Sequence, residues 1–128
     1  MSLVFFIPKK DGKKQMVQDC CYLNEHRVKN NYPLPLIAQL VDKLQGAKLF
    51  MKMDLRWGYN NVCIKGDDEW KAAFTCFHGL FELLVMYFGL CNSPATFQAM
   101  MNENFADMDN DVVVYIDDLM ILDRKSVV

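Results

Sequence analysis

The stretch Val112-Val113-Val114-Tyr115-Ile116-Asp117-Asp118-Leu119-Met120-Ile121-Leu122 places two adjacent carboxylates between two short apolar runs. Each run is too short for a helix and rich enough in β-branched residues to predict a strand. The pattern therefore predicts strand, tight Asp-Asp turn, strand, with both acids at the tip of a buried hairpin. Adjacent carboxylates resist ionising together unless a cation lies between them, and hard divalent cations prefer carboxylate oxygens. Asp117 and Asp118 mark either a metal site or an ordinary surface turn, where Asp is also favoured.

Length and composition indicate one globular domain. The chain has 128 residues, of which 52% are hydrophobic, so it can bury a core and is not a disordered chain. No run approaches the roughly 20 apolar residues of a membrane span. The N-terminal apolar run ends at Pro8 and a lysine cluster, which is not typical of a signal peptide.

Charge and cysteine usage narrow the class further. The net charge is only −2, but ten of the 14 Lys and Arg residues lie in residues 1–56 and eleven of the 16 acidic residues in residues 57–128. A basic half facing a polyanion and an acidic half holding metal would give this division, as would chance. The five cysteines lack the spacing of a zinc or redox motif, which favours a reduced, intracellular setting.

The first half of the chain predicts a hairpin and a helix. Leu3–Ile7 and Gln15–Gln18 read as strands joined through Asp11-Gly12, a strong hairpin signal. The four lysines of segment 9–14 form a patch suited to phosphate, or simply a solvated turn. An amphipathic helix follows and ends before Gly46. We expect the apolar stripe of this helix to pack in the core: Leu36, Ile37, Leu40, Val41 and Leu44.

The second half predicts a second hairpin and a second helix. Residues 72–77 and 80–86 read as strands joined through His78-Gly79. Ser93 is a natural N-cap and Pro94 a first helical residue. Behind them, four large apolar residues recur at helical spacing and are expected to pack in the core: Phe97, Met101, Phe105 and Met108.

Asp54 closes a predicted strand over residues 47–53. A carboxylate at the C-terminal end of a strand is well placed to bind a ligand, although Asp is also a common helix N-cap. If this strand neighbours the Asp117-Asp118 hairpin in one antiparallel sheet, three carboxylates converge. Such a set can hold two cations roughly 3.5–4 Å apart for phosphoryl transfer.

Seven short motifs run in order through nearly the whole chain: Phe6-Ile7-Pro8-Lys9-Lys10-Asp11-Gly12-Lys13, Leu23-Asn24, Tyr32-Pro33-Leu34-Pro35, Met53-Asp54-Leu55-Arg56 with Gly58-Tyr59, Asp68-Glu69-Trp70-Lys71 with Ala73-Phe74, Phe88-Gly89-Leu90 with Asn92-Ser93-Pro94-Ala95-Thr96-Phe97-Gln98, and Val113-Val114-Tyr115-Ile116-Asp117-Asp118. Together they resemble the fingers and palm of a reverse transcriptase, most closely those of gypsy-type long-terminal-repeat retrotransposon polyproteins. Any one motif is weak, whereas six or more in register are very specific.

The resemblance implies an α+β fold, namely a right-hand polymerase palm plus part of the fingers. In such a palm, helices pack on one face of an antiparallel sheet. The fingers-like segments would be about 1–46 and 60–92, and the palm segments about 47–59 and 93–128. The thumb, connection and ribonuclease H domains would lie outside this chain, so we expect little or no polymerase activity from residues 1–128 alone.

The resemblance also implies site residues. Asp54, Asp117 and Asp118 match the catalytic triad that holds two Mg²⁺ ions, for which Mn²⁺ can substitute, and the Leu55 carbonyl matches an extra ligand. The matching nucleotide contacts are Lys9 and Gln15, the backbone amides of Trp57 and Gly58, the steric-gate residue Tyr59 and the sugar contact Phe88. The matching primer and template contacts are Tyr115, Gly89 and Pro94.

Several positions depart from the family pattern. Gln15 stands where relatives carry an arginine that donates a charged fork to the triphosphate. The usual Asp-Tyr-Arg reads Asp19-Cys20-Cys21, and the usual Met-Pro-Phe-Gly reads Met86-Tyr87-Phe88-Gly89. Trp57 replaces a residue that is normally small.

Three hypotheses follow from these observations. The first is part of an RNA-directed and DNA-directed DNA polymerase, with a primed RNA or DNA template and dNTPs as partners and no membrane. Its expected location is the cytoplasm or a virus-like particle. The second is a decayed, non-catalytic remnant that at most binds nucleic acid. The third is a metal-dependent nucleotidyl transferase or cyclase of another lineage, against which the motif of residues 88–98 argues. The sequence leaves the oligomeric state open.

Overall fold

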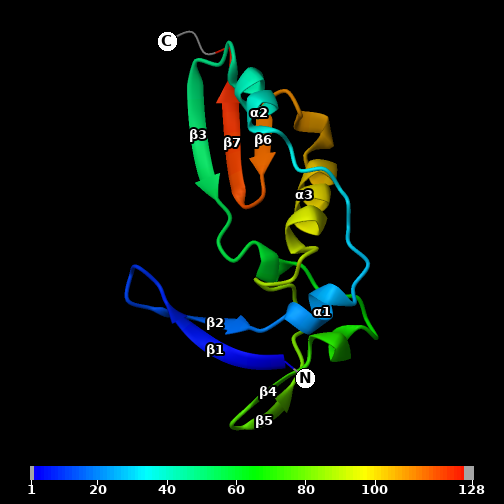
Figure 1. Ribbon diagram of the computed structural model, residues 1–128. Coiled ribbons are helices and arrows are strands. Elements are labelled where there is room, and N and C mark those ends of the chain that lie inside the picture. Colours follow the sequence, from blue (N-terminus) through cyan, green and yellow to red (C-terminus); the bar gives the residue numbers. More distant parts are fainter. Residues whose placement is uncertain (1, 126–128) are drawn as a thin grey trace. The chain divides into compact units, whose positions relative to one another are not determined.

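The computed structural model describes residues 2–125 as two compact units of mixed helix and strand (Figure 1). Unit 1 comprises residues 2–29 and Tyr59–Ser93, and unit 2 comprises Asn30–Gly58 and residues 94–125. The predicted α+β class is confirmed. Within the described residues, none of the helices has the length and apolar character needed to cross a membrane. The predicted boundaries of fingers and palm stay a prediction, and residues 1 and 126–128 lie outside the described residues.

Unit 1 contains a four-stranded mixed sheet in the order β2-β1-β4-β5. β1 pairs antiparallel with β2 and parallel with β4, and β4 pairs antiparallel with β5. The elements of this unit are β1 (Ser2–Pro8), β2 (Lys14–Gln18), α1 (Cys21–Glu25), the 3-10 turns η1 (Tyr59–Asn61) and η2 (Glu69–Ala72), β4 (Phe74–Cys76) and β5 (Gly79–Phe81).

The β1–β2 hairpin forms where Asp11-Gly12 predicted it. Gly12 has a φ of +79°, a conformation that only glycine adopts at no steric cost, and its N–H donates to the Lys9 carbonyl at 3.0 Å. The Lys9 N–H in turn donates to the Lys13 carbonyl at 2.7 Å. This turn leaves the lysines exposed at the tip of the hairpin.

The second predicted hairpin is shorter than expected. β5 ends at Phe81 instead of continuing to residue 86. The remainder of the predicted strand pairs with a different segment, because the Ile64 N–H donates to the Leu84 carbonyl and the Met86 N–H to the Val62 carbonyl. The predicted continuous strand over 80–86 is therefore wrong beyond Phe81, because tertiary pairing divides the run: its start pairs with β4, and Val85 forms an isolated bridge with Cys63.

A small core in unit 1 forms around Cys20 and Tyr87, together with Ala72 and Leu90. The Cys20 Sγ lies 3.7 Å from the Tyr87 hydroxyl, and both side chains are buried. Burial raises the pKa of the Cys20 thiol and of the Tyr87 phenol above their ordinary values. Two positions that depart from the family pattern are therefore packed against each other, a small side chain against a large one.

Unit 2 contains a three-stranded antiparallel sheet in the order β3-β7-β6, and Figure 1 shows the three strands side by side. Its core is formed by Val112–Val114 of β6, Leu119 and Leu122 of β7, and Phe97 and Met101 of α3. No residue of β3 is buried. The elements are α2 (Ile37–Leu44), β3 (Leu49–Asp54), α3 (Ser93–Asn104, in this unit from Pro94 on), η3 (Ala106–Met108), β6 (Val112–Tyr115) and β7 (Asp118–Asp123).

The expected core role of the α2 stripe is wrong. No residue of α2 is buried, Ile37 is 71% exposed, and only Leu40 and Leu44 are half-buried. Amphipathic spacing predicted the helix and its end before Gly46 correctly, but it does not determine how much of the face a neighbour covers.

Helix α3 is nearly as predicted. Phe97 and Met101 are buried, whereas Met108 is 51% exposed because it lies in η3, beyond the end of α3 at Asn104. Ser93 opens the helix, but its hydroxyl donates to the Tyr87 carbonyl at 3.3 Å, where an N-cap contact to a helix amide was predicted.

The buried phenol of Tyr87 predicts an alkaline weakness of the fold. Above about pH 10, its ordinary pKa, Tyr87 ionises in the unfolded chain but keeps its proton in the folded chain, so the free energy of unfolding falls as pH rises. We expect Tyr87→Phe to lack this loss. The difference in free energy of unfolding between Tyr87→Phe and the wild type should shift in favour of the variant by up to about 1.4 kcal/mol per pH unit above pH 10. Urea titrations from pH 8 to 11.5 measure the difference, and parallel curves would contradict it.

Candidate functional site

The turn of the aspartate hairpin is formed by Ile116 and Asp117, one residue earlier than the predicted Asp-Asp turn. Tyr115 and Asp118 are the last paired residues of β6 and β7, so Asp118 begins a strand. Ile116 has a φ of +53°. This left-handed conformation costs an L-residue about 1–2 kcal/mol and is unusual for a β-branched side chain. The strained residue directly precedes the two acids.

Gln98 of α3 lies beneath this turn and is fully buried. Its Oε1 accepts a hydrogen bond from the Ile116 N–H at 2.8 Å, and its Nε2 donates to the Val114 carbonyl at 3.2 Å. Nε2 also donates to the Asn102 Oδ1 at 2.9 Å. One amide thus joins α3 to the end of β6 and to the turn. The sequence offered a signal for it, a polar side chain beside Phe97 in an otherwise apolar helical stripe.

Asp54 lies directly opposite Asp118, because β3 pairs antiparallel with β7 over residues 49–54. The predicted adjacency of these strands is confirmed. Beyond the last pair, the Leu55 N–H donates to the Asp117 carbonyl at 3.0 Å. Residues paired directly across a sheet share a face, so Asp54, Asp118 and Tyr115 form one row across β3, β7 and β6.

The carboxylates of this row do not converge on a ready-made metal site. Among residues 2–125, no three His, Cys, Asp or Glu side chains form a group that could hold a metal ion. The Lys52 Nζ lies 3.1 Å from the Asp118 Oδ1. Lys52 precedes Asp54 by two residues and therefore shares its face. Lys52 was not among the predicted site residues, although its period-two spacing from Asp54 was a usable signal.

The donor set nevertheless fits a hard divalent cation. Three carboxylates and one backbone carbonyl supply oxygen ligands, the type that Mg²⁺ and Mn²⁺ prefer. Backbone pairing already brings Asp54 beside Asp118, and Leu55 beside Asp117. Strand pairing does not fix the side-chain rotamers of these aspartates, and a bound cation can select them.

The loop after Asp54 is tightly packed. The Gly58 N–H donates to the Leu55 carbonyl at 3.2 Å, so the amide predicted to contact a triphosphate closes a turn here. A Cβ on Gly58 would lie 3.1 Å from the Phe97 Cζ, which explains the glycine. Trp57 has a φ of +58° and is 63% exposed.

The nucleotide contacts predicted outside this loop belong to unit 1. Lys9 is exposed at the β1–β2 hairpin, and Gln15 of β2 pairs with Ile7 of β1. The rings of Tyr59 and Phe88 meet with centroids 4.9 Å apart at 58°, and Tyr59 is buried while Phe88 is exposed. The structure thus brings together the predicted steric gate and the predicted sugar contact.

Asn24 fixes the loop that contains the predicted primer contact Gly89. Its Nδ2 donates to the Gly89 carbonyl at 2.8 Å, and its Oδ1 accepts from the Cys91 N–H at 2.9 Å. Gly89 has a φ of +112°, which favours glycine. Asn24 belonged to a quoted motif but had no predicted role. The other two predicted primer contacts, Tyr115 and Pro94, belong to unit 2.

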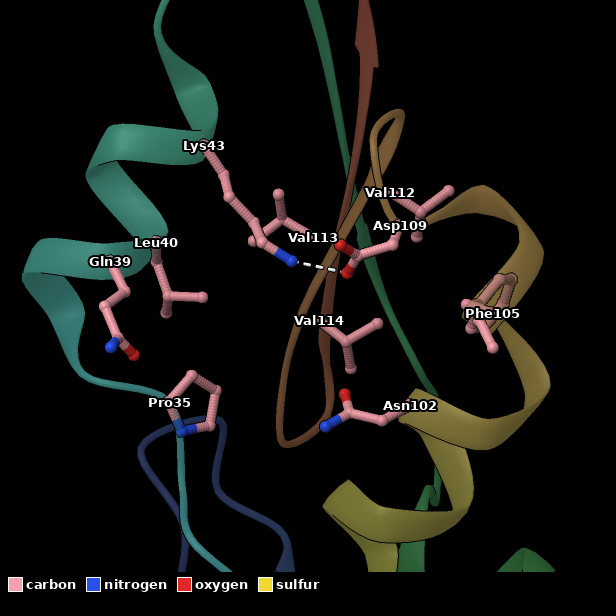
Figure 2. A pocket seen from close by; sticks show the side chains of 11 residues that line it. Pro35, Gln39, Leu40, Lys43, Asn102, Phe105, Asp109, Val112, Val113 and Val114 are labelled. Atoms are coloured by element: carbon pink, nitrogen blue, oxygen red, sulfur yellow. Dashed lines mark hydrogen bonds and ion pairs between the residues drawn. The ribbon is translucent and has the colours of Figure 1, made fainter.

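A cleft of about 450 Å³ in unit 2 lies between α2, α3 and β6 (Figure 2). Its apolar floor includes Val112, Val113 and Val114, and an ion pair between Lys43 and Asp109 spans it. Its lining includes none of the predicted site residues. The three aspartates predicted to bind metal therefore lie on or beside the sheet row, outside the cleft.

Comparison with known proteins finds a matching family model and similar polyproteins. Residues 7–126 match the family model "Reverse transcriptase (RNA-dependent DNA polymerase)". The chain is 44% identical over 124 residues to the Transposon Tf2-3 polyprotein of Schizosaccharomyces pombe (strain 972) and 43% identical to the Tf2-7 polyprotein. These alignments cover 96% of this chain and 9% of each polyprotein, so the chain spans about a tenth of those relatives.

Solved structures with the same fold include two complexes of the foamy viral protease-reverse transcriptase. The dRH form in complex with double-stranded DNA has a TM-score of 0.84 and 26% identity, covering 94% of this chain and 21% of that one. The complex with an RNA/DNA hybrid has a TM-score of 0.82 and 24% identity, covering 94% and 16%.

The Lys52–Asp118 ion pair predicts how this row responds to metal. A divalent cation at the carboxylates must displace or face the Lys52 ammonium, so Lys52→Met should tighten Mn²⁺ binding by about fivefold. Electron paramagnetic resonance of free Mn²⁺ measures the affinity. Lys48→Met makes the same charge change on a lysine whose N–H donates to the carbonyl of Asp123, at the other end of the β3–β7 pairing. An equal response from the two variants would contradict a local effect.

The close approach of Gly58 to Phe97 predicts a steric requirement. Gly58→Ala should lower the free energy of unfolding by about 1–3 kcal/mol, because the added methyl group crowds the Phe97 ring, which is buried and therefore closely packed. Gly66→Ala is the matched control, since a Cβ there meets no atom within 4 Å. Thermal unfolding of both variants tests this, and equal midpoints would contradict it.

Proposed function

Because the chain belongs to the reverse transcriptase family, we propose that it carries the catalytic centre of an RNA-directed and DNA-directed DNA polymerase in retrotransposon replication. The observation that carries the proposal is the row formed by Asp54 opposite Asp118, with Asp117 tied to Leu55. A carboxylate set on neighbouring strands of a rigid sheet is what nucleotidyl transfer requires.

Asp54, Asp117 and Asp118, with the Leu55 carbonyl, would hold two Mg²⁺ ions, for which Mn²⁺ can substitute. The bound cations would supply charge neutralisation of the triphosphate and activation of the primer 3′-hydroxyl. The chain itself would position these ligands. The pairing of β3 with β7 fixes the backbone positions of Asp54 and Asp118, and the hydrogen bond between Leu55 and Asp117 holds the loop after Asp54 beside the turn.

The incoming dNTP would be held by the residues that match the family's nucleotide contacts. Lys9 would contact the triphosphate from the exposed hairpin, and the amides of Trp57 and Gly58 would cradle it, the Gly58 N–H in exchange for its bond to the Leu55 carbonyl. Gln15, a neutral amide, would hold the triphosphate less tightly than an arginine fork. Tyr59, supported by its ring contact with Phe88, would exclude a 2′-hydroxyl and so select deoxyribose.

A primed RNA or DNA template is the proposed macromolecular partner. The foamy viral neighbours named above are complexes with an RNA/DNA hybrid and with double-stranded DNA, which supports this assignment. Tyr115, Gly89 and Pro94 would contact primer and template, and the exposed lysines at positions 9–14 would contact phosphates. The location that fits this role is the cytoplasm or a virus-like particle.

A second candidate is a remnant that binds nucleic acid without catalysis. Two observations favour it, the ion pair of Lys52 with Asp118 where a cation is needed, and the neutral Gln15. In this case the lysine hairpin would keep its phosphate contacts while the sheet row would have lost its function.

A chimera tests the catalytic proposal. We would replace the matched segment of the Tf2-3 polyprotein, to which this chain is 44% identical, with this chain and measure Mg²⁺-dependent dNTP incorporation on a primed RNA template. We expect incorporation, and Asp117→Asn should reduce it by at least about a hundredfold, because a charge-stabilising group is lost. Asp123→Asn, which changes an acid at the far end of β7, is the matched control.

The outcomes separate the two candidates. Incorporation that Asp117→Asn abolishes and Asp123→Asn leaves intact supports the polymerase. A chimera that binds primed template but incorporates nothing, even after Gln15→Arg, supports the remnant and overturns the catalytic proposal.

A further inference from the structure

The turn that carries Asp117 is held by a side chain from another element. Ile116, in the left-handed region at a φ of +53°, donates its N–H to the Gln98 Oε1 at 2.8 Å. The same amide donates to the carbonyl of Val114, two residues earlier on β6, at 3.2 Å. A strained conformation persists only where surrounding contacts hold it. Gln98 supplies two such contacts, one at Ile116 itself and one two residues before it.

The Gln98 amide is itself fixed in orientation. Both Nε2 donors are used, one by Val114 and one by the Asn102 Oδ1 at 2.9 Å, which leaves Oε1 directed at Ile116. Asn102 in turn donates to the Tyr32 hydroxyl at 2.9 Å. Because Gln98 is fully buried, water cannot replace these contacts. The turn is therefore attached to a helix by an amide with one possible orientation.

We propose that Gln98 is a positioning residue that holds the Ile116–Asp117 turn, and with it the Asp117 and Asp118 carboxylates, in the arrangement that takes up a divalent cation. The inference rests on the proposed metal role of these acids. Groups that orient metal ligands through a second contact typically affect metal affinity by about tenfold or more. Gln98 touches neither carboxylate, so its effect passes through the backbone of Ile116.

The test uses the 128-residue chain, Gln98→Met, and Met101→Ala as the matched control. Met101 is also buried on α3, so Met101→Ala disturbs the same helix at a different side chain. The first readout is Mn²⁺ affinity, from the broadening of the Asp117 and Asp118 amide signals in nuclear magnetic resonance titrations. The second is the hydrogen-exchange rate of the Ile116 amide relative to that of Leu122, whose N–H donates to the Asp111 carbonyl in the same hairpin.

We expect Gln98→Met to weaken Mn²⁺ binding by about tenfold and to raise the exchange ratio by at least about tenfold, as for a lost buried hydrogen bond. Met101→Ala should change neither the Mn²⁺ affinity nor the exchange ratio by more than about twofold. A general loss of stability speeds exchange at both the Ile116 and the Leu122 amides and so cancels in the exchange ratio. Where Asp117→Asn does weaken Mn²⁺ binding, unchanged affinity in Gln98→Met overturns the proposal, whether or not the Ile116 amide is released. Equal effects of the two variants also overturn it, since Gln98 would then be structural only.

Two further variants keep the test decisive. If Gln98→Met does not fold, Asn102→Ala replaces it in the test. Asn102 is exposed on α3 and accepts one hydrogen bond from the Gln98 amide, so its loss should raise the exchange ratio by about threefold. If Asp117→Asn binds Mn²⁺ as the wild type does, the proposed metal role fails. The exchange ratio needs no metal, and it then decides alone whether Gln98 holds the turn.

Discussion

The antiparallel pairing of β3 with β7 is the constraint on which the site depends. It places Asp54 opposite Asp118 and brings the Leu55 N–H to the Asp117 carbonyl. A register slip of one residue would turn Asp54 to the other face of the sheet, away from Asp118. Residues more than sixty positions apart in sequence thus become neighbours through main-chain hydrogen bonds, before any cation acts on their side chains.

Around this pairing, the structure combines strain with support. Ile116 and Trp57 both have positive φ values although neither is a glycine, and they lie in the turn and the loop that flank the aspartate row. Helix α3 contacts both segments, since Gln98 binds the Ile116 amide and Phe97 lies against Gly58, the residue after Trp57. One turn of α3 therefore supports both segments. Strain of this kind is typical of functional sites.

Local sequence signals predicted local structure well. Asp11-Gly12 predicted the first hairpin, and the apolar runs around Asp117-Asp118 predicted the second. The exact turn was displaced by one residue because the pairing of β7 with β3, and the amide of Gln98, decide which residue takes the positive φ. Lys52 was missed and the exposed face of α2 was misjudged for a related reason, since burial and ion pairing depend on neighbours that periodicity does not reveal.

Uptake of a divalent cation by the aspartate row is the property on which the proposed function depends. A crystal structure of the chain grown with Mn²⁺, with diffraction measured at the manganese absorption edge, tests it most directly. We expect an anomalous peak within about 2.1–2.4 Å of carboxylate oxygens from Asp54 and from Asp117 or Asp118, with Lys52 displaced from Asp118. Crystals saturated with Mn²⁺ that show no peak there, and Lys52 still paired with Asp118, would contradict it.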